Sequence, residues 1–230
     1  MPRLKSLPAV CVAAVAFLAA ACATDTPEEK ASDRVSLQNV VDGAAQTVTA
    51  FRTGENGAAV NAALADARGV LVYPKITRAA LLGGGSGGFG VLVGRSADGA
   101  WSSPAFMSYG GATFGLQAGV DTASVMAVIK NEQTLLALAE GKPVFGGSAN
   151  VVAGEGEAEQ PAKTTNADIV VFTRSLGGAY AGVNLGSGIV DPADDRNTNY
   201  YGHPATAVEI VVKQKVGSTD AAGLKAALSR

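Results

Sequence analysis

Histidine and cysteine are almost missing from this 230-residue chain, which contains one histidine and two cysteines. Cys11 and Cys22 both lie close to the N-terminus, so no disulfide can form within the rest of the chain. A histidine metal site or a Ser-His-Asp triad would depend on His203 alone, in the turn-forming sequence Tyr-Gly-His-Pro. We therefore expect His203 to be structural, and we expect no catalytic residue, no metal site and no cofactor.

Basic residues are also few, with 18 Lys and Arg against 20 Asp and Glu. Two of the basic residues, Arg3 and Lys5, belong to the N-terminal segment, which leaves 16 basic residues in the remainder. Nonspecific nucleic-acid binding requires a basic surface, so no nucleic-acid partner is expected. Contact with an anionic lipid would have to come from a local group of cations.

The long apolar run of the sequence is confined to residues 7–21 and is shorter than the roughly 20 residues that cross a bilayer. It follows Arg3 and Lys5, as in a signal peptide, and it ends Leu18-Ala-Ala-Ala-Cys22, which resembles a bacterial lipobox. The leucine stands four residues before the cysteine instead of the usual three. We predict a lipoprotein signal peptide over residues 1–21 and lipidation of Cys22. The alternative is an ordinary signal peptide cleaved after an Ala-x-Ala site.

The start of the mature chain is predicted to be a tether followed by helices. Residues 22–34 are polar and contain a proline, which is typical of flexible coil. Apolar residues then recur at helical spacing over residues 35–51, with Ser32 or Asp33 as N-cap and Gly54 as the stop. A second short helix is predicted over residues 58–67.

From residue 70 onward the apolar period changes to two, which predicts strands separated by Gly-rich turns. Pro74 should end the first strand, and Asn131 should cap a helix that continues to Leu138. A terminal helix is predicted over residues 221–228. The predicted strands cover residues 70–73, 89–94, 101–109, 112–120, 124–129, 144–152, 169–174 and 179–185. Residues 35–230 are thus predicted to form one α+β domain: a strongly bent, mostly antiparallel sheet or half-barrel, covered by helices from the chain ends.

Glycines gather in the segment 83–90, where Gly85, Gly87 and Gly90 fit a G-x-G-x-x-G pattern. A dinucleotide site would need a helix directly after the last glycine, and a strand-like sequence follows instead. We interpret the segment as a loop or a bulged strand. A nest of backbone N–H groups that binds phosphate is the alternative.

Basic residues bracket the first predicted strand, and they form the candidate lipid site. Arg68, Lys75 and Arg78 could converge on a lipid phosphate, with Tyr73 beside them as a membrane anchor. A solvated rim is the alternative interpretation. Tyr200 and Tyr201 are further aromatics expected near a membrane, while Trp101, Phe106, Phe114 and Tyr180 are expected in the core. The acidic run of Asp191, Asp194 and Asp195 is interpreted as a surface turn and not as a calcium site.

Five Gly-aromatic motifs follow one another in a fixed order along the chain. They are ARGVLVYP from Ala67, GAWSSPAF from Gly99, FGLQAG from Phe114, GGAYAGVNL from Gly177 and NTNYYGHP from Asn197. Together they resemble the SYLF domain family. That resemblance implies a phospholipid-binding, non-catalytic domain whose lipid contact involves basic residues and an amphipathic N-terminal helix. The matching segment here, residues 35–51, contains no lysine, so we expect it to pack on the sheet.

These observations together predict a bacterial envelope lipoprotein. Ala23, which directly follows Cys22, resembles the pattern of lipoproteins sorted to the outer membrane. The expected partners are membrane phospholipids with anionic head groups, contacted by Arg68, Tyr73, Lys75 and Arg78. Actin, which some eukaryotic relatives bind, is not expected. The alternative is a structural or scaffolding protein that binds another envelope protein and touches lipid only through its acyl anchor.

Overall fold

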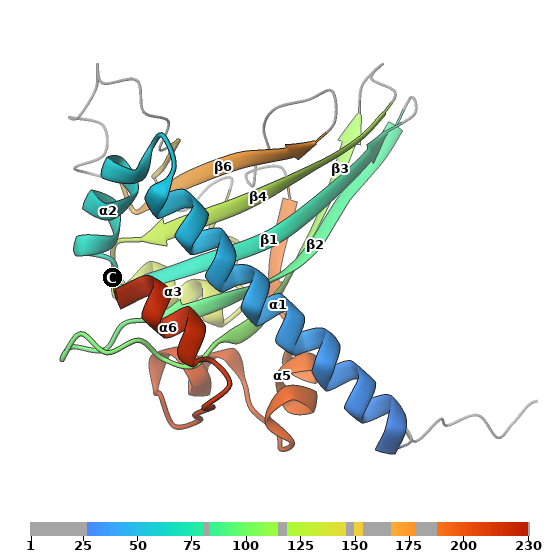
Figure 1. The fold of residues 1–230 in the computed structure, drawn as a ribbon, viewed down its shortest axis with the longest axis vertical. Helices are drawn as coiled ribbons and strands as arrows, with labels where there is room; N and C mark the ends of the chain where they lie inside the picture. Colours follow the sequence, from blue (N-terminus) through green and yellow to red (C-terminus); the bar gives the residue numbers. More distant parts are fainter. Residues whose placement is uncertain are drawn as a thin grey trace, which may run out of the picture.

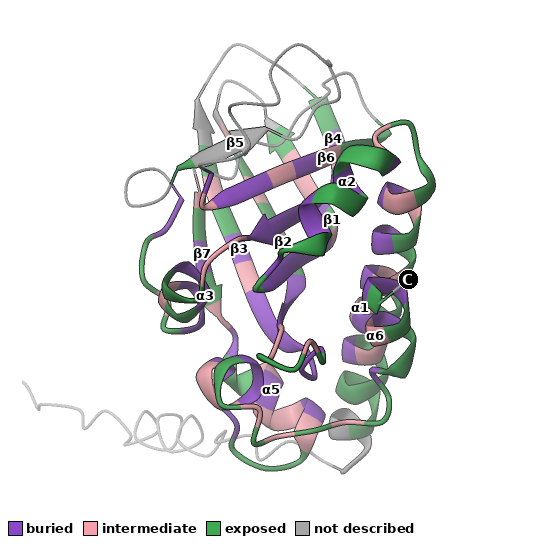
Figure 2. Ribbon diagram, turned by 90° about the vertical axis from the view of Figure 1, so that its left-hand side faces the viewer, coloured by how far each residue is buried: buried purple, intermediate pink, exposed green. Residues whose placement is uncertain are grey.

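A seven-stranded sheet with helices on both faces forms the centre of the molecule, as Figures 1 and 2 show. The computed structural model describes residues 27–80, 83–114, 119–145, 150–153, 167–177 and 188–229. Residues 1–21 and Cys22, predicted as signal peptide and lipidation site, lie outside these ranges, as does the predicted strand over residues 179–185. Among the described residues, no helix is long and apolar enough to span a membrane.

The strand order in the sheet is β5-β6-β4-β1-β2-β3-β7. Every neighbouring pair is antiparallel except β5 with β6, which run parallel. The strands are β1 (Gly69–Ala80), β2 (Gly83–Gly94), β3 (Ala105–Phe114), β4 (Gly119–Ile129), β5 (Val151–Ala153), β6 (Ile169–Gly177) and β7 (Gly188–Pro192). Because β5 and β7 lie at opposite edges, the sheet is open, and the predicted α+β class with a mostly antiparallel sheet is confirmed.

Helices from both ends of the chain cover the sheet. They are α1 (Pro27–Thr53), α2 (Gly57–Ala65), α3 (Glu132–Ala139), α5 (Asp194–Tyr201), the π-helical turn η2 (Val208–Val212) and α6 (Ala222–Ser229). Figure 2 shows α1 and α6 on one side of the sheet and α3 on the other. The predicted cap of α3 is confirmed, because the side-chain oxygen of Asn131 accepts a hydrogen bond from the backbone N–H of Thr134 at 2.8 Å.

Alternate residues of the central strands are buried in two separate cores, one on each face of the sheet. Val70 and Val72 pack with α1, α2 and α6, and we call this side the α1 face. Leu71 and Tyr73 pack with α3 and η2 on the opposite side, the α3 face. Both faces of the central strands are therefore buried, which explains why β1 lacks the simple apolar and polar alternation of a half-exposed strand.

Helix α1 lies along the sheet through an apolar stripe at helical spacing. Leu37, Val41, Ala44, Val48 and Phe51 are all buried, as the sequence pattern predicts. The helix begins at Pro27 and not near residue 35, so the prediction of a tether was wrong for residues 27–34. Proline fits the first turn of a helix because its missing N–H would have no partner there, and the two glutamates that follow it favour the positive end of the helix dipole.

Strand β1 continues through Pro74 to Ala80, which corrects the prediction that the proline ends it. The pairing with β2 shifts register between Val72 and Lys75, and the pairing with β4 shifts between Tyr73 and Ile76. Pro74 therefore lies in a bulge on both sides, where no ladder hydrogen bond needs its missing N–H.

The glycine-rich segment is a regular part of β2. Residues 83–90 pair with β3 in unbroken register, and residues 84–89 pair with β1. Their N–H groups are committed to a sheet ladder, so neither a dinucleotide fingerprint nor a phosphate nest forms there. The acidic run is also not a simple surface turn, because Asp194 and Asp195 form the first turn of α5.

Candidate functional site

The four predicted lipid-binding residues do not form one site. Arg68 directly precedes β1, and Arg78 lies near its other end. Ten residues of extended strand separate them, a span of about 33 Å. Arg68, Lys75 and Arg78 therefore cannot converge on a single phosphate.

Arg78 is engaged inside the sheet. Its Nε donates to Oδ1 of Asp121 at 2.9 Å, and the side chains of Arg78 and Asp121 are only 18% and 8% exposed. The pair lies on the α3 face, where Arg78 of β1 stands opposite Asp121 of β4. A guanidinium that neutralises a buried carboxylate stabilises the fold and is not free for a head group.

The tyrosines expected at a membrane are mostly in the core. Tyr73 is fully buried, its hydroxyl donates to the backbone oxygen of Ser108 at 3.2 Å, and burial raises its pKa far above the ordinary value. Tyr200 is also buried and donates to the side-chain oxygen of Gln38 on α1. The prediction that Tyr73 and Tyr200 are accessible was wrong. Of the four residues expected in the core, Trp101 and Phe106 are buried; the side chains of Phe114 and Tyr180 lie outside the described part of the chain.

The NTNYYGHP motif has a structural role. Buried Asn197 accepts from the backbone N–H of Phe106 at 2.7 Å and donates to Asp194, so it joins α5 to the start of β3. The hydroxyl of Tyr201 donates to the backbone oxygen of Pro104 at 2.7 Å. His203 is exposed, and in the described residues no serine or carboxylate is hydrogen-bonded to it.

A different surface emerges where the strands extend beyond the helices, which we call the projecting end (residues 75–80, 83–89, 108–114, 119–124, 174–177 and 188–191; Figure 1). On its α1 face, side chains from β1, β2 and β3 lie in two rows across the sheet. One row is Thr77, Gly87 and Gly110, and the next is Ala79, Gly85 and Ala112. We call these six residues the small-residue floor; all are exposed except Thr77, which is half-buried.

The glycines of β2 and β3 differ sharply between the two faces of the sheet. On the α3 face, a Cβ at Gly90 would lie 2.3 Å from the oxygen of Val72, and a Cβ at Gly88 would lie 2.6 Å from the oxygen of Lys75. On the α1 face, a Cβ at Gly87 would meet nothing closer than 3.6 Å, and one at Gly110 would meet nothing within 4 Å. Close packing therefore requires glycine at positions 88 and 90, but it does not require glycine at the floor positions.

Exposed apolar side chains border the floor. Of the large hydrophobic residues exposed in the described part of the chain, four belong to the projecting end: Phe89, Val120, Leu176 and Ile189. By strand alternation, Phe89, Val120 and Ile189 lie on the α1 face, and they are 41%, 64% and 68% exposed. The floor is therefore a smooth surface with an apolar rim.

Cations lie between the floor and the helices. Lys75 is paired with Phe89 in register, and Arg174 is two residues beyond buried Phe172 on the same face; both are exposed. The guanidinium of Arg196 stacks over the Phe89 ring, 3.7 Å from its centroid. Among the described acidic residues, Asp191 of β7 stands opposite Ser108 in the strand register, but its carboxylate lies on the α3 side, where a Cβ at Gly141 would be 3.6 Å from its Oδ1. Lys75 is the one predicted site residue that belongs to this surface; Arg174 was not predicted, because its nearness depends on strand pairing.

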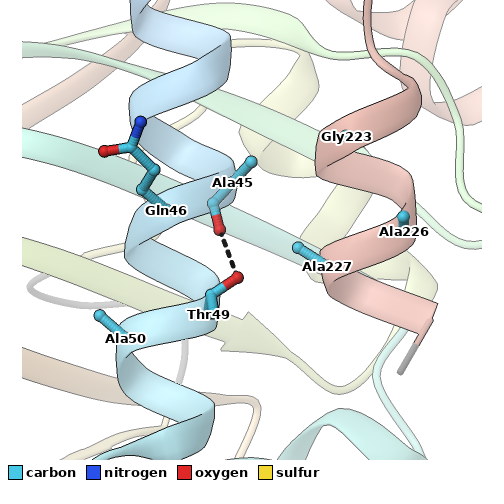
Figure 3. A pocket seen from close by; sticks show the side chains of 7 residues that line it. All are labelled: Ala45, Gln46, Thr49, Ala50, Gly223, Ala226 and Ala227. Atoms are coloured by element: carbon cyan, nitrogen blue, oxygen red, sulfur yellow. Dashed lines mark hydrogen bonds between the residues drawn. The ribbon is translucent and has the colours of Figure 1, made fainter.

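A groove lies between α1 and α6, with a volume of about 430 Å³. Figure 3 shows its lining, with Ala45, Gln46, Thr49 and Ala50 on α1 and Gly223, Ala226 and Ala227 on α6. The hydroxyl of Thr49 bonds back to the oxygen of Ala45 in its own helix. None of the described residues that line this groove is charged, so they offer nothing to hold an anionic head group.

Comparison with known proteins gives a family match over residues 110–230, to a model described as Ysc84, Las17-binding protein actin regulator. Protein YSC84 of Saccharomyces cerevisiae is 28% identical over 141 residues, which cover 59% of this chain and 30% of the relative. SH3 domain-containing YSC84-like protein 1 of Homo sapiens is 25% identical over 155 residues, covering 64% of this chain and 44% of the relative. The matched region thus spans less than half the length of these relatives. No solved structure matches.

Proposed function

This chain belongs to the Ysc84 family, the SYLF-domain family that its motifs resemble, and on that premise we propose that it is a non-catalytic module that binds anionic phospholipid surfaces. We further propose that lipidation of Cys22 anchors it in the outer membrane as a lipoprotein. The description of the family names a binding protein and actin regulator, and not an enzyme.

The observation that carries the proposal is the composition of the projecting end on its α1 face. Exposed apolar residues, a smooth small-residue floor and the cations Lys75 and Arg174 lie on one surface. Isolated exposed apolar residues are ordinary, but a grouped apolar border beside cations is typical of an interaction site. The carboxylate of Asp121 does not oppose these cations, because it lies on the α3 face and pairs with Arg78 there.

The expected affinity of this surface is modest. Each basic residue near an anionic membrane contributes about 1 kcal/mol, so Lys75 and Arg174 together give about 2 kcal/mol. Stable membrane attachment generally takes two signals, such as an acyl chain with a basic patch. A weak surface on the domain and a lipid chain on Cys22 would therefore act together.

Helix α1 is not the membrane contact in this proposal. Its apolar stripe is buried against the sheet, and its sequence contains more acidic than basic residues. Two of its basic residues are engaged, since Arg34 pairs with Asp220 and Arg52 donates to backbone oxygens of α6. An interfacial helix needs a free apolar face and a basic polar face, and α1 does not present this combination.

Liposome co-sedimentation tests the proposal. The chain without residues 1–22 keeps every described residue and has no anchor. We expect it to sediment with vesicles that contain phosphatidylglycerol and not with neutral phosphatidylcholine vesicles, and we expect salt to weaken the binding. The double reversal K75E/R174E should lower the bound fraction. The matched reversal R68E/K213E changes the same charge at exposed sites on the helix-covered end and should bind like the parent.

The second candidate is a scaffolding protein that binds another protein. The description of the family, which includes Las17 binding, and the SH3 domain in the name of the human relative favour it. Those activities belong to proteins more than twice as long as the matched region. Absence of sedimentation with every vesicle type would reject the lipid proposal in favour of this one.

A further inference from the structure

We propose that the anchor and the small-residue floor act on different membranes: held by a lipid on Cys22, the domain presents the floor to a second anionic phospholipid surface. This inference rests on the proposed lipid binding and lipidation. It adds that the membrane bound by the floor is not the membrane that holds the anchor.

The anchor is confined to the N-terminal end of α1. Only residues 23–26 separate Cys22 from Pro27, where the helix begins. Five residue steps extend at most about 17 Å. The 27-residue helix is itself about 40 Å long. A lipidated Cys22 therefore stays near one end of α1 and cannot reach the other.

The floor lies at the opposite end of the molecule. Helix α1 crosses β1 at Gly43, where a Cβ would come within 3.1 Å of Pro74. From this crossing, α1 runs back about 24 Å to Pro27, while β1 runs on about 20 Å to Ala80. Figures 1 and 2 show these two arms diverging toward opposite ends of the longest axis. The segment of residues 23–26 is too short to bring a lipidated Cys22 to the floor.

The helix layer also keeps the floor away from a membrane that lies along α1. Helices α1 and α6 stand on the α1 face of the sheet, as Figure 2 shows, and they pack against each other. A helix with its side chains is about 10 Å thick. A bilayer resting on these helices would be separated from the small-residue floor by about that distance, so contact from the side of the anchor is disfavoured.

The occupant that fits the floor is an anionic phospholipid surface. Lys75 and Arg174 supply exposed positive charge, and Val120 and Ile189 supply exposed apolar area beside it. This positive charge is carried by two exposed side chains, so the binding should depend strongly on salt. The floor glycines, which have space for larger side chains, leave the surface flat.

A vesicle-clustering experiment tests the direction of binding. The chain without residues 1–21 contains Cys22 as its one cysteine, so the thiol can be coupled specifically to a maleimide lipid in phosphatidylcholine donor vesicles. We expect these donors to cluster acceptor vesicles that contain phosphatidylglycerol, measured by light scattering, and not neutral acceptors. K75E/R174E should lower the clustering rate by roughly an order of magnitude, while R68E/K213E should leave it unchanged.

Three outcomes would overturn the inference. Failure to cluster anionic acceptors, when the uncoupled chain sediments with the same vesicles, would show that binding occurs only on the anchoring membrane. Loss of clustering when the donor vesicles also contain phosphatidylglycerol would likewise show that the floor binds the anchoring membrane. Clustering of donors without any acceptor would identify a second copy as the occupant. Failure of the uncoupled chain to bind any vesicle is distinct, because it rejects the proposed function itself.

Discussion

Arg78 and Asp121 are 43 residues apart in the chain, and the Nε of the first lies 2.9 Å from Oδ1 of the second across neighbouring strands. Both side chains are largely shielded from solvent. An arginine that the sequence suggests for lipid binding is thereby fixed in the interior, and the surface charge of the projecting end falls to other residues.

Removing one partner of this ion pair should destabilise the protein. We expect R78A and D121A each to lower the free energy of unfolding by about 3 kcal/mol, because each leaves a buried charge uncompensated. Urea denaturation followed by circular dichroism measures the change. The double variant R78M/D121L should recover much of the loss and should sediment with anionic vesicles like the parent. Equal stability of R78A and the parent would contradict a structural role for the pair.

Alanine substitutions at two glycines of β2, one on each face of the sheet, should have very different effects on stability. G90A would place a Cβ 2.3 Å from the oxygen of Val72 and 2.6 Å from the ring of Tyr73, so we expect a loss of more than about 3 kcal/mol or failure to fold. G87A meets nothing closer than 3.6 Å. It should leave stability unchanged or raise it by about 0.5 kcal/mol, because glycine is disfavoured within strands. Thermal unfolding of both variants is the measurement, and comparable losses in the two would refute the asymmetry.

Stability should fall at alkaline pH because tyrosine hydroxyls are buried in their neutral form. Burial raises the pKa of Tyr73, and also those of Tyr200 and Tyr201. The unfolded chain releases these protons near the ordinary pKa of about 10, while the folded chain retains them. The stabilisation is therefore fully present below about pH 10 and is lost as the pH rises above it.

The variant Y73F isolates one tyrosine. Above about pH 10, each retained proton gives a slope of about 1.4 kcal/mol per pH unit, so Y73F should reduce the steepness by about that amount. At neutral pH the variant also loses the bond to Ser108, a separate cost of about 1 kcal/mol. Urea unfolding between pH 8 and 11 distinguishes the two effects, and an unchanged slope in Y73F would contradict burial of the neutral hydroxyl.

The parts of the fold that were predicted correctly depend on local chemistry. The apolar stripe of α1 and the cap at Asn131 each follow from residues within a few positions of one another. The end of β1 was mispredicted because Pro74 reads as a stop locally, yet β2 and β4 both continue past it and leave a bulge where no N–H is needed. The start of α1 was missed because Pro27 fits both a coil and the first turn of a helix.

The candidate site depended far more on the tertiary structure. Arg68 and Arg78 are close in sequence, but an extended strand places them at opposite ends. Lys75 and Arg174 are far apart in sequence, but two strand pairings bring them to the same face. The sequence neighbours of Tyr73 suggest an accessible side chain. Its place in the sheet buries it instead, because Gly90 leaves room for its ring.

The sequence by itself determined the family through its ordered motifs, the α+β class through the change of apolar period, and the buried stripe of the first helix. These follow from covalent neighbours and from spacing along the chain. Only the tertiary structure decided which cations are free, which glycines are required by packing, and that the N-terminal end of α1 lies opposite the small-residue floor. The physical reason is that charge pairing, steric clearance and direction are properties of strands and helices that meet from distant parts of the chain.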